Sequence, residues 1–146
     1  MIEGVSVKEL RSNLDKVGLT LDIWGDENPP GPLCASSCRM LFPGMLEAWV
    51  SRREAAERIA CLEGTIKLVL CDRREGSPTH DEVMELFLGE YRFREVIVPP
   101  GVLRGWKAVG DRTALVFLAL EGGSADALSL TPDEAGVPYD WDIVMQ

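Results

Sequence analysis

Residues 58–71 read RIACLEGTIKLVLC, and this stretch decides the fold. Two runs of mostly apolar side chains, residues 58–62 and 65–71, are separated only by Glu63 and Gly64. A short interruption that contains glycine, placed between two such runs, is typical of a β-hairpin. The stretch therefore predicts two antiparallel strands joined by a tight turn.

The same pattern continues outward from this hairpin in both directions. Further short apolar or alternating runs lie at residues 19–24, 45–52, 85–88, 95–98, 105–109 and 113–120. Segments rich in glycine, proline and aspartate separate many of these runs. Only residues 54–58 look helical, and they are too few to carry a helical fold. We expect an all-β sandwich or barrel that forms one domain over residues 1–146.

Composition and charge narrow the functional classes. Hydrophobic residues make up 46% of the chain, which is typical of a globular protein. A formal charge of −9 repels nucleic-acid phosphates, so general nucleic-acid binding is excluded. The longest wholly apolar run, residues 114–120, falls far short of the roughly 20 residues that span a bilayer, and the start lacks the pattern of a secretory signal. We expect a soluble cytoplasmic protein that does not bind membranes.

Four cysteines are too few for a disulfide scaffold in a chain of this length. Cys61 and Cys71 are flanked by apolar residues, so we expect both to be buried thiols. Cys34 and Cys38 have metal-like spacing, but no histidine and no second close cysteine pair lie near them. We therefore predict a loop with free thiols, no metal site and no cofactor.

Several motifs, taken in order, resemble the dTDP-4-keto-6-deoxysugar 3,5-epimerases, the dTDP-4-dehydrorhamnose epimerase-like (RmlC-like) cupins. Gly64 and the D-x-R-x-x-S-P-T string at residues 72–79 match one family element, and residues 96–106 match its I-P-x-G-x-x-H-G-(aromatic) strand. Residues 132–134 match its late P-D-E, and residues 137–141 its I-P-Y-D-W. The resemblance implies a double-stranded β-helix, that is, a cupin or jelly-roll barrel, usually present as a homodimer. It also implies a role in deoxysugar or surface-polysaccharide metabolism.

The catalytic positions depart from the family pattern. Family members remove a proton next to a sugar ketone, which requires a positioned base and an acid. The resemblance places Val50 at the family's histidine base and Arg104 at its later histidine. Residues 122–128, where the resemblance places the family's tyrosine acid, contain no tyrosine. Arginine is a poor base because it stays protonated. No catalytic residue is assigned, and Glu47 and Asp140 are the remaining candidates.

Three arginines and two tryptophans are the candidate ligand-binding residues. Alternation over residues 45–52 places Arg52 on one face with Val50, and Glu47, Trp49 and Ser51 on the other. The resemblance places Arg58 near a ligand's phosphates and Arg104 inside the barrel, and paired guanidinium groups suit a nucleotide sugar or small anion. The alternative is internal salt bridges to acidic residues, namely Glu47, Glu54, Glu57 and Asp140.

Trp49 and Trp106 lie beside these motifs, where each could stack on a base or a sugar. Core packing or dimer contact is the alternative for both rings. His80, the sole histidine, follows Ser-Pro-Thr and is expected to be a solvated loop residue.

Three functional hypotheses remain open at this point. The leading one is a degenerate cupin that keeps the barrel and a nucleotide-sugar or anion pocket but lacks 3,5-epimerase activity. The second is an active nucleotide-sugar epimerase or isomerase with non-standard catalytic residues. The third is a non-catalytic dimeric interaction protein. The side chains that face the barrel interior distinguish a ligand site from a structural core.

Overall fold

The computed structural model describes residues 1–25 and 29–142, and its elements are nearly all strands. The first are β1 (Ser6–Glu9), β2 (Arg11–Leu14), β3 (Leu19–Asp22) and β4 (Leu33–Leu41). They are followed by β5 (Leu46–Arg52), β6 (Ala55–Glu63), β7 (Thr65–Asp72), β8 (Val83–Gly89), β9 (Arg94–Val98), β10 (Val102–Ala108), β11 (Ala114–Gly122), β12 (Ala127–Ser129) and the helix α1 (Pro132–Ala135). The all-β fold class is confirmed.

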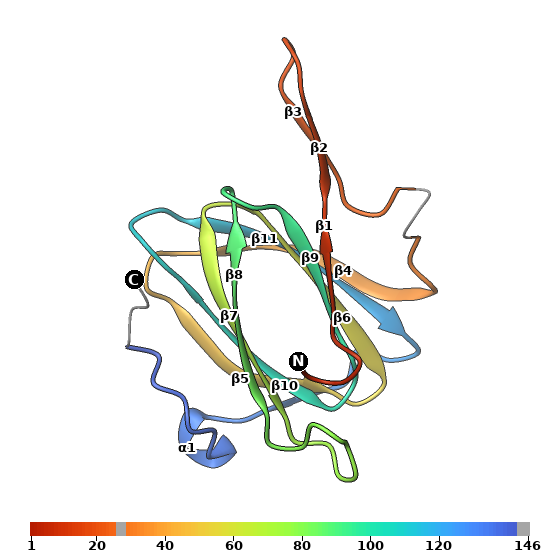
Figure 1. Cartoon of the computed structure of the whole chain (residues 1–146), viewed down its shortest axis with the longest axis vertical. Helices are drawn as coiled ribbons and strands as arrows, with labels where there is room; N and C mark the ends of the chain where they lie inside the picture. Colours follow the sequence, from red (N-terminus) through yellow and green to blue (C-terminus); the bar gives the residue numbers. More distant parts are fainter. Residues whose placement is uncertain (26–28, 143–146) are drawn as a thin grey trace.

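Two five-stranded antiparallel sheets face each other and enclose a barrel (Figure 1). The first sheet has the order β1-β9-β6-β11-β4, and the second has the order β12-β5-β10-β7-β8. Strands β4 to β7 alternate between the two sheets along the chain, and so do β8 to β12. This winding is that of a jelly-roll barrel, as predicted.

The barrel interior is packed with apolar side chains from both sheets. β6 and β11 contribute Ile59, Val116 and Leu118, and all three are almost completely buried. β7 contributes Leu68 and Leu70 from the opposite sheet. Because alternate residues of a strand point to opposite faces, these positions identify which neighbours also point inward.

A hairpin formed by β2 and β3 projects from the barrel (Figure 1). Leu14, Val17 and Leu19 are 78%, 88% and 50% exposed, so its apolar side chains are largely in contact with solvent. Exposed apolar surface gathered on one projecting element is typical of an interaction site.

Some local predictions were wrong. Residues 54–58 do not form the short helix that their sequence suggested, because β6 begins at Ala55. Cys34 and Cys38 lie exposed in β4 rather than in a loop. This strand escaped prediction because its sequence, LCASSCRML, is largely small and polar without clear alternation. Cys61 and Cys71 are buried free thiols, as predicted. Among the described residues, no helix has the length and apolar character needed to cross a bilayer.

Candidate ligand-binding site

A chain of five charged side chains lies on the interior side of β4, β5, β6 and β10. Arg104 donates from Nε and Nη2 to the two carboxylate oxygens of Glu57, at 2.9 and 3.0 Å, and from Nη1 to Glu47 at 2.6 Å. Arg52 Nε donates to the same Glu57 carboxylate at 3.1 Å. Arg39 Nη1 donates to Glu47 at 3.2 Å. We call Arg39, Glu47, Arg104, Glu57 and Arg52 the interior ion-pair chain.

Strand alternation explains how two of these residues reach the interior. In β10, Val102 and Trp106 belong to the interior core, so Arg104 between them points the same way. In β6, Ile59 belongs to that core, so Glu57 also points inward. Both side chains are essentially buried, and burial of a charge is tolerated only with such pairing.

A register shift in β5 brings Glu47 to the same face. Val50 lies opposite Arg104 on β10, whereas Ala48 lies opposite Gly105, so Trp49 is an extra residue in this ladder. A bulge of this kind interrupts strict alternation. The predicted grouping of Glu47 with Trp49 on one face is therefore wrong.

The arginines control the charge state of Glu47. Partial burial opposes ionisation, but the hydrogen bond and charge of Arg104, with the charges of Arg39 and Arg52, hold the pKa of the Glu47 carboxyl below its usual value. For Arg104, burial likewise favours the neutral form, and Glu57 and Glu47 outweigh it, so its pKa is raised. The hydrogen bonds and charges of this cluster therefore favour the ionised forms of both Glu47 and Arg104.

Trp106 lies against this chain and is fully buried. The Arg104 guanidinium carbon lies 3.8 Å from the centroid of the indole ring, and that of Arg39 lies 5.7 Å from it. Both contacts fall within the range of cation–π attraction. The indole Nε1 has no hydrogen-bond partner among the described residues. Such a buried donor is typically satisfied by water or a ligand.

Arg58 is not part of the interior chain. It follows Glu57 in β6 and therefore points to the opposite face, where it donates to Glu95 at 2.8 and 3.2 Å and to Glu121 at 3.0 Å. Trp24 covers this pair and donates from Nε1 to Glu95 at 2.7 Å. The structure therefore brings Arg52 and Arg104 together but places Arg58 on the outer face of the barrel, so the prediction of a single three-arginine pocket is wrong.

Trp49 and Asp140 also lie outside the barrel. Trp49 packs against Trp141 with ring centroids 5.4 Å apart, in an outer apolar cluster on the second sheet. Asp140 accepts a hydrogen bond from the backbone of Asp142 in the same outer segment. Glu54 is exposed between β5 and β6. Of the two candidate catalytic residues, only Glu47 thus reaches the interior.

Neither tyrosine reaches the interior either. Tyr139 donates to Glu85 on the outer face of the second sheet, and burial together with Glu85 raises the pKa of its hydroxyl. Tyr91 is 92% exposed. His80 lies in the loop between β7 and β8, where its Nδ1 is 2.9 Å from the carbonyl oxygen of Arg74. The interior ion-pair chain therefore contains no histidine or tyrosine.

The D-x-R-x-x-S-P-T motif forms a loop clamp rather than a part of this site. Asp72 is fully buried and accepts hydrogen bonds from Arg74 Nε at 2.9 Å and from the hydroxyls of Ser77 and Thr79, both at 2.6 Å. Arg74 and Thr79 also bind the backbone of Glu3. The Arg74 guanidinium and the two hydroxyls hold the pKa of Asp72 far below its usual range. The motif fastens the N-terminal segment to the loop between β7 and β8.

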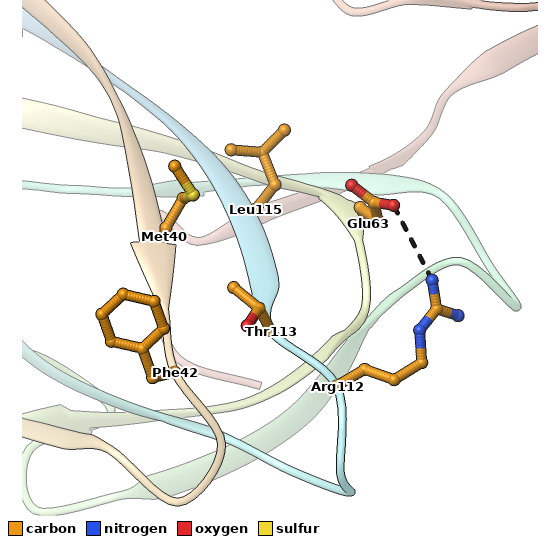
Figure 2. A pocket seen from close by; sticks show the side chains of 6 residues that line it. All are labelled: Met40, Phe42, Glu63, Arg112, Thr113 and Leu115. Carbon is orange, nitrogen blue, oxygen red and sulfur yellow. Dashed lines mark ion pairs between the residues drawn. The ribbon is translucent and has the colours of Figure 1, made fainter.

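A separate surface groove of about 520 Å³ lies near the ends of β4, β6 and β11 (Figure 2). Met40, Phe42 and Leu115 supply its apolar side chains. Arg112 and Glu63 lie 3.7 Å apart at its edge. Since Met40 and Leu115 neighbour inward-pointing residues in their strands, the groove is on the outer surface of the barrel.

The jelly-roll winding, with a polar cluster inside the barrel, defines a cupin. The chain belongs to the dTDP-4-dehydrorhamnose 3,5-epimerase family, whose model matches residues 44–145. It is 30% identical over 143 residues to Agl13 of Haloferax volcanii, a probable low-salt glycan biosynthesis epimerase, and this match covers 95% of the chain and 89% of the relative. Its family is therefore one of deoxysugar and polysaccharide biosynthesis.

Two further similarities agree with this assignment. The spore coat polysaccharide biosynthesis protein SpsL of Bacillus subtilis is 27% identical over 142 residues, covering 96% of the chain and 91% of SpsL. The crystal structure of a dTDP sugar isomerase from Desulfovibrio desulfuricans superposes with a TM-score of 0.88 at 26% identity, covering 96% of this chain and 92% of that one. The match extends over nearly the full length of the chain in both cases.

Proposed function

We propose that this protein binds a nucleotide sugar or a related anionic ligand at the interior ion-pair chain and lacks 3,5-epimerase activity. The observation that carries the proposal is the pairing of Val50 with Arg104 across β5 and β10. Val50 stands where the resemblance places the base, and its side chain cannot accept a proton. Arg104 faces it and, as a permanently protonated group, cannot replace the base.

The ligand class follows from the family and from the charges. Both the family name and the similar dTDP sugar isomerase point to dTDP-linked sugars. The interior ion-pair chain holds one more arginine than glutamate, so it has net positive charge in a protein of net charge −9. Guanidinium groups hold phosphate oxygens through charge-assisted hydrogen bonds. A diphosphate-linked sugar suits this combination better than a neutral sugar.

An active isomerase that uses Glu47 is the second candidate function. Of the two glutamates in the interior ion-pair chain, only Glu47 is substantially exposed, with 42% of its side chain accessible to solvent. The Arg104 guanidinium beside it could stabilise an enolate. However, the arginines lower the pKa of Glu47, which weakens it as a base. Asp140 is a poor alternative because it lies outside the barrel.

The two candidates make different predictions for proton exchange. With dTDP-4-keto-6-deoxyglucose in heavy water, we expect no deuterium at C3 or C5 above the rate without protein, measured by proton NMR. In parallel, titration calorimetry should detect binding of dTDP. Exchange that is present in the wild type and in Asp140→Asn but lost in Glu47→Gln would instead establish the isomerase. Absence of any nucleotide binding would favour an interaction protein.

We propose further that the protein is a cytoplasmic homodimer. The exposed apolar side chains of the β2–β3 hairpin support this, as does the edge strand β4, whose residues are mostly exposed. An unpaired edge strand is an available surface for another chain. In a two-fold dimer each copy would offer the same surfaces to its partner. Light scattering at micromolar concentration should give twice the mass of one chain.

A further inference from the structure

Glu47 separates Arg104 from solvent. Two of the three guanidinium nitrogens of Arg104 donate to Glu57, and the third, Nη1, donates to Glu47. The Glu47 carboxylate also accepts from Arg39, whose side chain is 35% exposed, whereas the side chain of Arg104 is fully buried. The Glu47 carboxylate therefore lies between the guanidinium groups of Arg39 and Arg104, on the solvent side of the interior ion-pair chain.

The two glutamates of the interior ion-pair chain differ strongly in the burial of their carboxylates. Glu57 is 3% exposed and accepts hydrogen bonds from Arg104 and Arg52, so removing its carboxylate would leave buried charges unpaired. Glu47 is 42% exposed, so its carboxylate can turn toward water when another anion takes its place on the buried Arg104. Glu47, rather than Glu57, is therefore the carboxylate that another anion can displace.

Trp106 independently supports a bound ligand beside Arg39 and Arg104. Its indole Nε1 is buried and lacks a partner among residues 1–25 and 29–142. The same ring is flanked by the two arginines that hold Glu47. An unsatisfied buried donor is costly, and an oxygen of a bound molecule would remove that cost. The ring that carries this unsatisfied donor therefore packs against the two arginines that a ligand would contact.

We propose that Glu47 is an internal competitor of the ligand, so that an oxyanion of the bound molecule replaces the Glu47 carboxylate on Arg39 and on Nη1 of Arg104. This inference rests on the proposed function. A phosphate and a sugar carboxylate share the required chemistry, since each presents two oxygens to paired guanidinium groups. A neutral sugar cannot make the exchange, because it would bring no negative charge to replace the Glu47 carboxylate beside Arg39 and Nη1 of Arg104.

Titration calorimetry with Glu47→Gln tests the exchange directly. This variant keeps the shape of the side chain and removes the competing charge, so we expect dTDP to bind at least tenfold more tightly than to the wild type, a gain of about 1.4 kcal/mol. Glu90→Gln is the matched control, because it removes the same charge from a single partly exposed pair with Arg112 elsewhere. Its affinity should equal that of the wild type. Arg39→Gln should bind at least tenfold more weakly.

Inorganic pyrophosphate and glucuronate, titrated separately, identify the anion. Tighter binding to Glu47→Gln for pyrophosphate alone assigns the position to a phosphate, and tighter binding for glucuronate alone assigns it to a sugar carboxylate. Melting curves verify that the variant folds, with Glu47→Ala as a second variant if glutamine fails.

Unchanged or weaker dTDP binding by a folded Glu47 variant overturns the exchange. If the wild type nevertheless binds dTDP, the proposed function stands without it. If neither protein binds any of these anions, both proposals fall.

Discussion

The ring of Trp141 lies directly against the backbone of Gly105. A β-carbon at position 105 would lie 2.6 Å from Cζ2 of that ring and 2.9 Å from the β-carbon of Ala48. Gly105 separates Arg104 from Trp106 in β10, and both of these neighbours point into the barrel. Gly105, which has no side chain, thus separates the interior ion-pair chain from the outer apolar cluster of Trp49 and Trp141.

Gly105→Ala should lower the free energy of unfolding. The added methyl group cannot fit without moving Trp141, and overpacking of this kind costs about 1–3 kcal/mol. Urea denaturation followed by tryptophan fluorescence measures the change. Gly123→Ala is the matched control, because a β-carbon there meets nothing within 4 Å. Equal midpoints for the two variants would contradict the packing argument.

Asp72→Asn should destabilise the protein in a pH-dependent way. Loss of the buried, paired charge should cost on the order of 3 kcal/mol at pH 7. Because the pKa of Asp72 is lower in the folded chain than the unfolded value of about 3.9, its contribution is complete above that value and disappears as the pH falls further. Denaturation at several pH values should therefore show wild type and variant converging below about pH 4. A difference that stays constant with pH would show that the carboxylate charge is not the cause.

Arg58→Lys should affect stability without affecting ligand affinity. Lysine keeps the charge but loses the planar fork that holds Glu95, which should cost about 1–2 kcal/mol. Arg58 lies on the outer face, so the dissociation constant for dTDP should stay within twofold of the wild type. A tenfold loss of affinity would show that the outer face takes part in binding.

The double variant Leu14→Ser/Val17→Ser should convert the proposed homodimer into monomers. Both side chains are more than three-quarters exposed on the β2–β3 hairpin, so the change should not disturb the barrel core. The serines would weaken only the apolar burial that these side chains gain against a partner subunit. Light scattering measures the mass, with Tyr91→Ser as a control on another exposed apolar residue. An unchanged dimer would exclude the hairpin from the interface.

The fold was largely predictable because its strands are marked by short apolar runs between turn residues. The inward direction of Arg104 was also expected, from its place in a motif. Two orientations were predicted wrongly. The resemblance placed Arg58 near the ligand, and a one-residue difference in a strand is enough to move a side chain to the opposite face. Periodicity failed for Glu47, because the extra residue at Trp49 interrupts the alternation of β5.

The partners of the arginines were only partly foreseen. Glu47 and Glu57 do pair with Arg52 and Arg104, as the salt-bridge alternative stated. Arg39 was missed because its strand has no clear alternation. Its long-range partner Glu47 is brought near by the winding of the barrel, and no local sequence pattern reports such a contact.

The pairing of Arg104 with two glutamates makes it difficult to introduce a histidine base at position 50 by single mutations. A histidine introduced at position 50 would face a buried guanidinium that is fixed by Glu57 and Glu47. Replacing Arg104 first would leave Glu57 buried with one partner fewer, at a cost of several kcal/mol. Each single substitution is thus unfavourable, and a histidine base at this position would require coordinated changes at several barrel positions.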